Sequence, residues 1–261
     1  MPEHNLALQA RGLSKHFGGV AAMDTLDLDV RAGETLGVIG PNGAGKSTLI
    51  NLISGGLSAD AGAIRLHGED ITRLRADART RLGIGRTYQI PRPFAGMSVR
   101  ENLELAARHA RRTGAHPDQG IAERCRRILT RTGLADVAEI AAGSLPLLRR
   151  KRLELARALA LQPRLLLLDE IGAGLIEVET RALIELIIDL KQEIETIVLI
   201  EHVMDVIKAC CERTAVLASG KLLLLGATRE VLSDAQVAAV YLGTSERAHG
   251  PDSASEGAPV R

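Results

Sequence analysis

The chain has 261 residues, enough to bury a substantial core in one large domain or in one domain with an insert. Its 33 basic residues nearly balance 32 acidic ones, and the formal net charge of +1 gives no overall field that would favour a nucleic-acid partner. The three cysteines have no zinc-site or disulfide spacing, which suits a reducing cytosol, and no uncharged run reaches the roughly 18 residues of a transmembrane helix.

The first part of the chain alternates apolar with polar residues at 6–8 and 26–30, which predicts strands with one face in water. Between them lies Phe17, followed by two glycines. Its ring could stack on an adenine or be buried as an ordinary edge residue, and the sequence leaves both interpretations open. An apolar run at 35–39 predicts a buried strand, and 49–53 predicts a helix.

Between that strand and that helix lies a complete G-x-x-x-x-G-K-S phosphate loop. Its glycines let several N–H groups point at one spot, where the helix N-terminus adds positive charge for a polyphosphate. Lys46 would neutralise the β- and γ-phosphates, and the Ser47 hydroxyl would bind Mg²⁺. The competing interpretation is a glycine-rich turn, which the order of strand, loop and helix disfavours. The predicted nucleotide-binding residues are Gly40, Pro41, Asn42, Gly43, Ala44, Gly45, Lys46, Ser47 and Thr48.

The middle of the chain is predicted to be mostly helical. Short strands at 63–66 and 84–88 flank an Arg-rich helix at 73–82, and Gln89 follows the second strand directly. The prolines of 91–94 mark an exit from the core. Ser98 and Glu101 form a capping box that opens a helix through His109, and a polar connection at 111–120 leads to a basic helix at 121–132 that Gly133 ends.

The last part alternates helices with buried strands. A helix at 146–161 precedes the apolar strand 164–170, which ends in Asp169 and Glu170. A helix at 177–193 precedes a second apolar strand at 196–202, which ends in His202. Strands at 214–218 and 222–225 and two short helices follow, and from Ser245 the composition predicts a disordered tail.

Several polar residues are expected to meet in one crevice, because ligands of open α/β sheets bind beyond the C-terminal strand ends. Asp169 would hold Mg²⁺ through water or Ser47, and Glu170 would act as general base on the attacking water. Gln89 would orient that water or contact Mg²⁺, and His202 would hydrogen-bond the γ-phosphate. Each alone is typical of a solvated edge residue, but behind a phosphate loop they jointly favour catalysis.

These motifs resemble the ATP-binding subunit of an ABC transporter along nearly the full chain, through Phe17, the phosphate loop, Gln89, residues 165–170 and His202. Residues 85–89, 93–103 and 240–243 are similar to the branched-chain amino acid importer type. The resemblance implies an α/β fold, a P-loop ABC ATPase core of mixed sheet and flanking helices. Residues 1–88 and 163–243 would form that core, 89–162 the Q-loop and an inserted helical subdomain, and 244–261 a disordered tail.

The resemblance also implies the function, hydrolysis of ATP with Mg²⁺ to drive transport. Two such ATPase subunits would sandwich two nucleotides and bind transmembrane permease subunits through the groove near Gln89, at the cytoplasmic face of the plasma membrane. The implied catalytic residues are Glu170, His202, Gln89 and Lys46, and the implied metal ligands are Ser47, Gln89 and Asp169.

One segment departs from the family pattern. A Leu-Ser-Gly-Gly-Gln-like motif would grip the γ-phosphate of the opposite subunit, but this chain has leucines at 147 and 148 after Pro146, which has neither hydroxyl nor N–H. Each lost contact would slow hydrolysis on the order of 10²-fold, unless Arg149 supplies a replacement charge. Ile176 and Ile171 also replace the usual Asp or Asn and the usual Pro. We therefore expect an asymmetric pair, with a related partner that carries an intact motif.

Three other functions compete with this one. A nucleotide-gated regulatory or assembly ATPase fits residues 146–149, although Glu170 and His202 favour turnover. A soluble ABC-type ATPase acting on nucleic acid or ribosomes usually carries two cassettes or a long coiled coil, and the sequence has one cassette and no sustained heptads. In a small-molecule phosphotransferase the insert and the terminal histidine would have no role.

Overall fold

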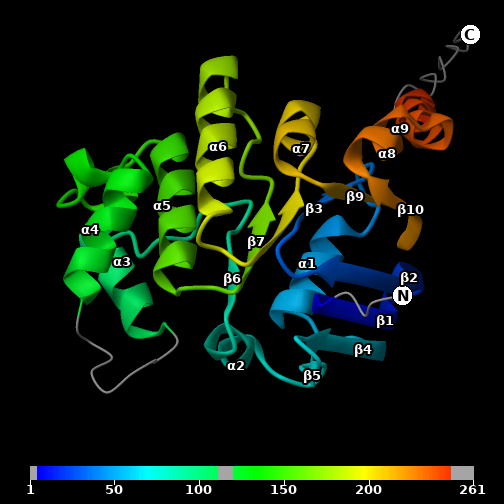
Figure 1. The fold of residues 1–261 in the computed structure, drawn as a ribbon, viewed down its shortest axis with the longest axis horizontal. Coiled ribbons are helices and arrows are strands. Elements are labelled where there is room, and N and C mark those ends of the chain that lie inside the picture. Colours follow the sequence, from blue (N-terminus) through cyan, green and yellow to red (C-terminus); the bar gives the residue numbers. More distant parts are fainter. Residues whose placement is uncertain (1–4, 111–119, 248–261) are drawn as a thin grey trace, which may run out of the picture.

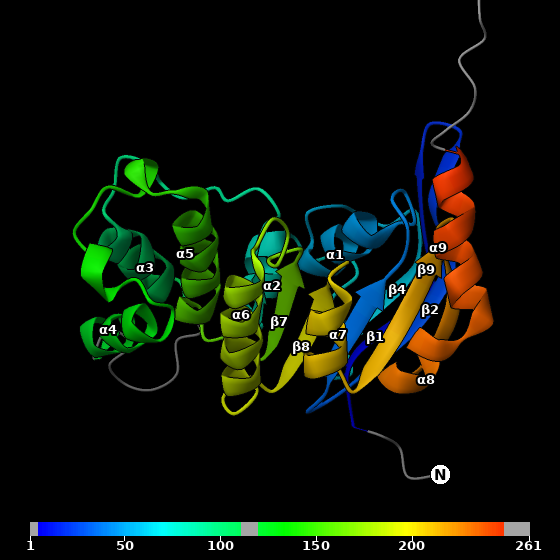
Figure 2. The ribbon, with the colours of Figure 1, turned by 90° about the horizontal axis from the view of Figure 1, so that it is seen from above.

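The computed structural model describes residues 5–110 and 120–247, which form two sheets and a lobe of helices (Figures 1 and 2). The larger sheet has six strands in the order β10-β9-β3-β8-β7-β6, and all its pairings are parallel except that of β10 with β9. Its strands are β3 (Thr35–Ile39), β6 (Ile84–Arg86), β7 (Leu165–Asp169), β8 (Thr196–Ile200), β9 (Arg213–Ala218) and β10 (Lys221–Ala227).

The central strands are buried on both faces, which explains their unbroken apolar runs. In β7, Leu167 packs into one hydrophobic cluster and Leu168 into another on the opposite face. Helices α6 (Glu177–Leu190) and α7 (Met204–Cys210) cover the second face. Helix α7 has only seven residues, too few for a clear hydrophobic period, and was therefore not predicted.

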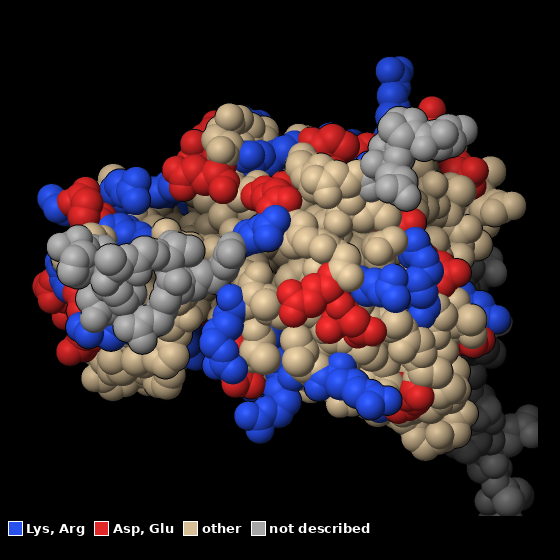
Figure 3. Space-filling model, turned by 60° about the horizontal axis from the view of Figure 1, so that its bottom comes forward, with Lys and Arg blue, Asp and Glu red and all other residues tan. Residues whose placement is uncertain are grey.

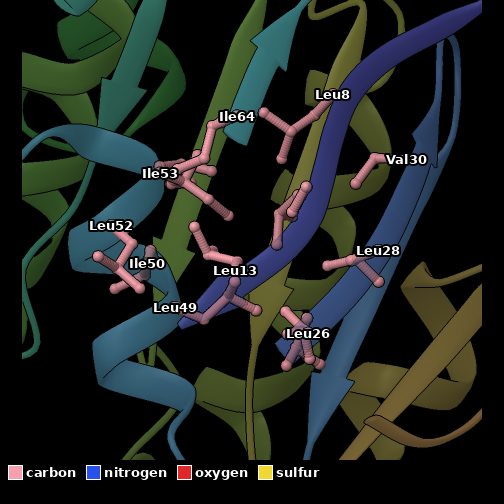
Figure 4. Close-up of a cluster of buried hydrophobic side chains, with 14 of the residues drawn as sticks. Leu8, Leu13, Leu26, Leu28, Val30, Leu49, Ile50, Leu52, Ile53 and Ile64 are labelled. Carbon is pink, nitrogen blue, oxygen red and sulfur yellow. The ribbon is translucent and has the colours of Figure 1, made fainter. Parts of the chain in front are cut away.

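The smaller sheet is antiparallel, in the order β2-β1-β4-β5, and covers the first face of the large sheet together with α1 (Lys46–Ser54). Its strands are β1 (Leu6–Phe17), β2 (Val20–Arg31), β4 (Ala61–Leu66) and β5 (Glu69–Asp70). Leu13 of β1, Leu26 of β2 and Leu49 of α1 belong to the cluster that joins these layers (Figure 4). Strands β1 and β2 are longer than predicted, because their pairing continues to the exposed hairpin at Phe17 and Val20.

The helical lobe lies at one end of the molecule (Figure 1) and has a hydrophobic cluster of its own. It contains α3 (Val99–Arg108), α4 (Ile121–Arg131), α5 (Leu147–Ala160) and two 3₁₀ turns (Ala135–Val137 and Ala142–Ser144). The predicted capping box is confirmed, since Ser98 Oγ accepts from the Glu101 amide at 3.1 Å and Glu101 Oε2 from the Ser98 amide at 2.7 Å. Of the predicted polar connection, 111–119 lies outside the described residues, and the domain limits at 89 and 162 stay a prediction.

Other predicted boundaries also differ from those of the structure. The strand predicted at 84–88 ends at Arg86, and the helix predicted at 73–82 is confined to α2 (Ala76–Arg81). After α8 (Thr228–Ser233), α9 (Ala235–Arg247) has 13 residues and continues through Ser245, where a disordered tail was expected. The rest of that tail, 248–261, lies outside the described residues.

The surface carries charges of both signs. Figure 3 shows a face on which Lys and Arg are interspersed with Asp and Glu, in keeping with the formal net charge of +1. Across residues 5–110 and 120–247, no helix is both long and apolar enough to span a bilayer.

Candidate active site

The phosphate loop packs closely against strands of both sheets, and this close packing explains why two of its positions are glycine. A Cβ atom on Gly40 would lie 2.2 Å from the Leu217 carbonyl oxygen. Gly45 has a φ of +103°, and a Cβ there would lie 2.6 Å from the Ala22 carbonyl oxygen. Any larger residue at either position would have to displace backbone, so the tight loop requires glycine.

Lys46 lies at the start of α1 with only 7% of its surface exposed. Its Nζ donates to the carbonyl oxygens of Gly40 at 2.7 Å and Pro41 at 2.9 Å. Burial lowers the pKa of Lys46, and the charges of Glu170 and Asp169 partly offset that shift. Among the described residues no side chain caps α1, so no cap occupies the first backbone N–H groups of this helix. The Lys46 ammonium group belongs to the same end of the helix. This arrangement suits a polyphosphate.

The two acids at the end of β7 differ in environment. Asp169 is 4% exposed, and its Oδ2 lies 3.2 Å from Arg86 Nη2. Burial raises the pKa of Asp169, and the Arg86 charge acts in the opposite direction. Glu170 has a φ of +48°, and its Oε2 accepts from Gln89 Nε2 at 2.5 Å. The structure therefore places Gln89 directly on Glu170.

The remaining predicted residues are more exposed. The His202 side chain is exposed at the end of β8, and Ser47 is exposed on the first turn of α1. Phe17 is 49% exposed, with Lys15 Nζ 5.7 Å from its ring centroid. Its ring is therefore not a buried edge residue, and stacking on adenine remains the interpretation that fits. The catalytic, metal-binding and nucleotide-binding roles of these residues stay predictions.

Arg86 is a site residue to which the sequence analysis gave no role. Its guanidinium donates to Asn51 Oδ1 at 2.7 Å, Ser54 Oγ at 3.0 Å and Asp169, and lies 4.6 Å from the Tyr88 ring centroid. Arg86 thereby links β6 to α1, the helix that follows the phosphate loop, and to β7. A charged residue within a short apolar strand was the signal that could have indicated a buried ion pair.

Glu201 was also missed, although it precedes His202 directly. It is fully buried, and its Oε1 accepts from the Gly172 amide at 2.6 Å. A Cβ on Gly172 would lie 3.0 Å from that oxygen. Glu201 thus holds the loop after Glu170 against the end of β8, and burial raises its pKa.

We expect Glu201→Gln to change how stability depends on pH. Because the folded pKa of Glu201 is raised, its contribution to the free energy of unfolding is fully present below the unfolded pKa of about 4.3. That contribution is lost as the pH rises through the higher folded pKa, and the variant lacks this loss. Urea unfolding at a series of pH values measures it, with Glu185→Gln, an exposed acid, as control. Parallel curves for wild type and Glu201→Gln would contradict the assignment.

The segment in place of the phosphate-gripping motif lies at the start of α5. Pro146 precedes the helix, and Leu147 is 63% exposed. Arg149 Nη2 lies 2.9 Å from Asp136 Oδ2, and Arg150 donates to Leu145 and Gly143 carbonyl oxygens. Arg149 is therefore already paired, which weakens it as a replacement charge. Ile176 is 66% exposed where the family pattern has a polar residue.

Comparison with known proteins settles the family. The ABC transporter family profile matches residues 23–173, more than half of the chain. The chain belongs to the ABC transporter family. This ABC subunit therefore binds ATP and is an ATPase, as the resemblance in its motifs implied.

Its relatives confirm the predicted importer type. A probable branched-chain amino acid transport ATP-binding protein LivG of Archaeoglobus fulgidus is 34% identical, with 92% of this chain and 96% of the relative covered. The LivG protein of Escherichia coli K12, described as a high-affinity branched-chain amino acid transport ATP-binding protein, is also 34% identical, with 90% and 97% covered.

Solved structures confirm the α/β ABC ATPase fold. A nucleotide-free ATP-binding cassette from an ABC transporter superposes with a TM-score of 0.81 at 29% identity, covering 90% of this chain and 98% of that one. An ABC cassette in its ADP conformation gives a TM-score of 0.81 at 30% identity, covering 91% and 99%.

Proposed function

We propose that this ABC subunit hydrolyses ATP to drive import of branched-chain amino acids or similar small polar solutes. It works in a pair of nucleotide-binding subunits, bound to permease subunits at the cytoplasmic face of the plasma membrane. The names and full-length coverage of its relatives support the solute class. The contact of Gln89 with Glu170 carries the proposal, because it links the expected base to the point where the helical insert leaves the core.

The residues fit a magnesium-assisted hydrolysis. The expected ligands, the Ser47 hydroxyl, the Gln89 amide oxygen and the Asp169 carboxylate, are oxygen donors of the kind Mg²⁺ prefers. When bound, Mg²⁺ neutralises charge on the β- and γ-phosphates. Lys46 leaves the loop carbonyls and binds those phosphate oxygens, and the backbone amides of α1 hold the same groups.

The chemical step breaks the bond between the γ-phosphorus and the oxygen that bridges to the β-phosphate. A water oxygen forms the new bond to the γ-phosphorus, and its proton passes to Glu170. Gln89, hydrogen-bonded to Glu170, orients that carboxylate and the water. His202, exposed at the same edge of the sheet, donates to the γ-phosphate.

The pair is asymmetric in this proposal. A partner with an intact gripping motif completes the Lys46 site, while the opposite site, completed by residues 145–149 of this chain, mainly holds ATP. The pairing of Arg149 with Asp136 supports this asymmetry. The same observation favours a second candidate function, a nucleotide-gated regulatory subunit with little turnover.

Reconstitution tests the proposal. With its permease subunits and a related ATPase in proteoliposomes, the chain should drive ATP-dependent uptake of leucine. Lys46→Ala removes charged hydrogen bonds of about 1.5–3 kcal/mol, so we expect ATP affinity to fall about 10- to 100-fold and uptake to be lost. Lys208→Ala, which changes an exposed lysine of α7, is the control.

The result that contradicts the proposal is unchanged ATP affinity and uptake in Lys46→Ala. ATP-dependent dimerisation with neither hydrolysis nor uptake would favour the regulatory candidate instead.

A further inference from the structure

A cavity of about 200 Å³ lies between α5 and α6, which stand side by side in both ribbon views (Figures 1 and 2). Each helix lines it with residues at the spacing of one helical face, including Leu148, Arg152 and Leu155 of α5 and Glu179, Leu183 and Leu186 of α6. One water needs about 10–15 Å³ of such space, so the cavity can hold several waters. The cavity therefore has room for a small organic molecule.

Two charged side chains of the lining have polar atoms that bond no described residue. Arg152 makes no hydrogen bond or ion pair with any described residue, and its guanidinium is held beside Gly133, where a Cβ would lie 2.7 Å from Nη1. Glu179 uses Oε2 to accept the Ile176 amide at 3.0 Å, and no described residue bonds its Oε1. The other two charged wall residues are already engaged, since Lys151 donates to the Ala173 carbonyl oxygen and Arg131 pairs with Asp189 and Glu193.

These groups define the chemistry of a ligand. An unpaired guanidinium favours a carboxylate, which it can bind through two hydrogen bonds. A free carboxylate oxygen favours an ammonium group, and the leucines around them favour an aliphatic chain. We propose that the cavity between α5 and α6 binds a branched-chain α-amino acid through Arg152, Glu179 and the leucines. The choice of this side chain rests on the proposed function, because the ligand is then the imported solute.

The cavity adjoins both segments that act on ATP. Ile171 and Leu175 of its lining belong to the loop after Glu170, which Glu201 holds in place. Leu148 belongs to the segment that faces the opposite nucleotide in the proposed pair. A ligand that fills the space between α5 and α6 opposes any narrower arrangement of the two helices, so it shifts the population away from such states. Because the cavity shares Ile171 and Leu175 with the loop after Glu170, we expect bound amino acid to slow hydrolysis, which would couple import to the internal concentration of solute.

Calorimetric titration of the purified full chain with L-leucine, without nucleotide, tests the site directly. We expect saturable binding at one site. 4-Methylpentanoate is leucine without the ammonium group and isopentylamine is leucine without the carboxylate, so each should bind at least about tenfold more weakly. Leucine should also lower the ATPase rate of the wild-type chain.

Two variants separate the site from general effects on folding. Arg152→Gln removes the carboxylate partner and should weaken leucine binding about tenfold or more. Leu183→Phe fills the cavity from α6 and should abolish binding. Both should leave ATP affinity unchanged. Arg127→Gln, a matched change of an exposed α4 arginine outside this cavity, should bind leucine like wild type.

The inference is overturned if wild-type chain that binds ATP shows no saturable leucine binding, or if both cavity variants bind leucine normally. Its failure is distinguishable from failure of the proposed function. A chain that drives leucine uptake but binds no leucine itself loses only the cavity site, whereas a chain that binds leucine at Arg152 but drives no uptake loses only the import function.

Discussion

Glu170→Gln should lower the rate of ATP hydrolysis by about 10²- to 10⁴-fold while ATP affinity stays nearly unchanged. Glutamine keeps the size of the side chain and can still bond Gln89, but it cannot take a proton from the attacking water. The loss therefore falls on the chemical step and not on binding. Phosphate release under saturating ATP, with nucleotide affinity measured separately, gives both quantities.

Two further variants make this result specific. Glu185→Gln changes an exposed glutamate of α6 and should hydrolyse ATP like wild type. Gln89→Ala removes the hydrogen bond to Glu170 but leaves the carboxylate, so we expect a smaller loss than in Glu170→Gln. Undiminished turnover in Glu170→Gln would remove Glu170 as the general base.

Pro146→Ser combined with Leu148→Gly should raise hydrolysis at the site that this segment completes, on the order of 10²-fold for each restored contact. Serine supplies the hydroxyl and N–H that proline lacks, and glycine lets the backbone approach the γ-phosphate. Pro146 precedes α5 and Leu148 lies in its first turn, so both changes are local. Turnover is measured in the assembled pair, with Glu170→Gln in the chain that carries the changed segment, so that the other site reports alone.

Folding and specificity need their own controls in this experiment. Glycine in a helix costs about 1 kcal/mol relative to alanine, so unfolding curves must show that the double variant stays folded. Ile188→Ala shortens an exposed apolar side chain of α6 outside this segment, and should leave turnover unchanged. If the folded double variant hydrolyses no faster, the departure at 146–149 does not limit this site.

The two experiments together distinguish the candidate functions. An importer ATPase requires a large loss in Glu170→Gln. A regulatory subunit requires little turnover before and after that change. The Pro146→Ser and Leu148→Gly changes then show whether the site completed by residues 145–149 hydrolyses ATP slowly because of these residues.

The sequence alone determined the local parts of this ATPase. The phosphate loop was predictable because its glycines, Lys46 and Ser47 act within one strand–loop–helix unit, where spacing along the chain equals arrangement in space. The buried strands β7 and β8 were predictable because both faces are covered, which leaves unbroken apolar runs. Family membership followed from these motifs, and the relatives confirm it.

Only the tertiary structure decided what distant segments do to one another. The bond of Gln89 to Glu170, the pairing of Arg86 with Asp169 and the hold of Glu201 on Gly172 all join residues far apart in the chain. No local period encodes such contacts, since they depend on which strands become neighbours in the sheet. The cavity between α5 and α6 has the same origin, because it exists only where two separately predicted helices meet side by side.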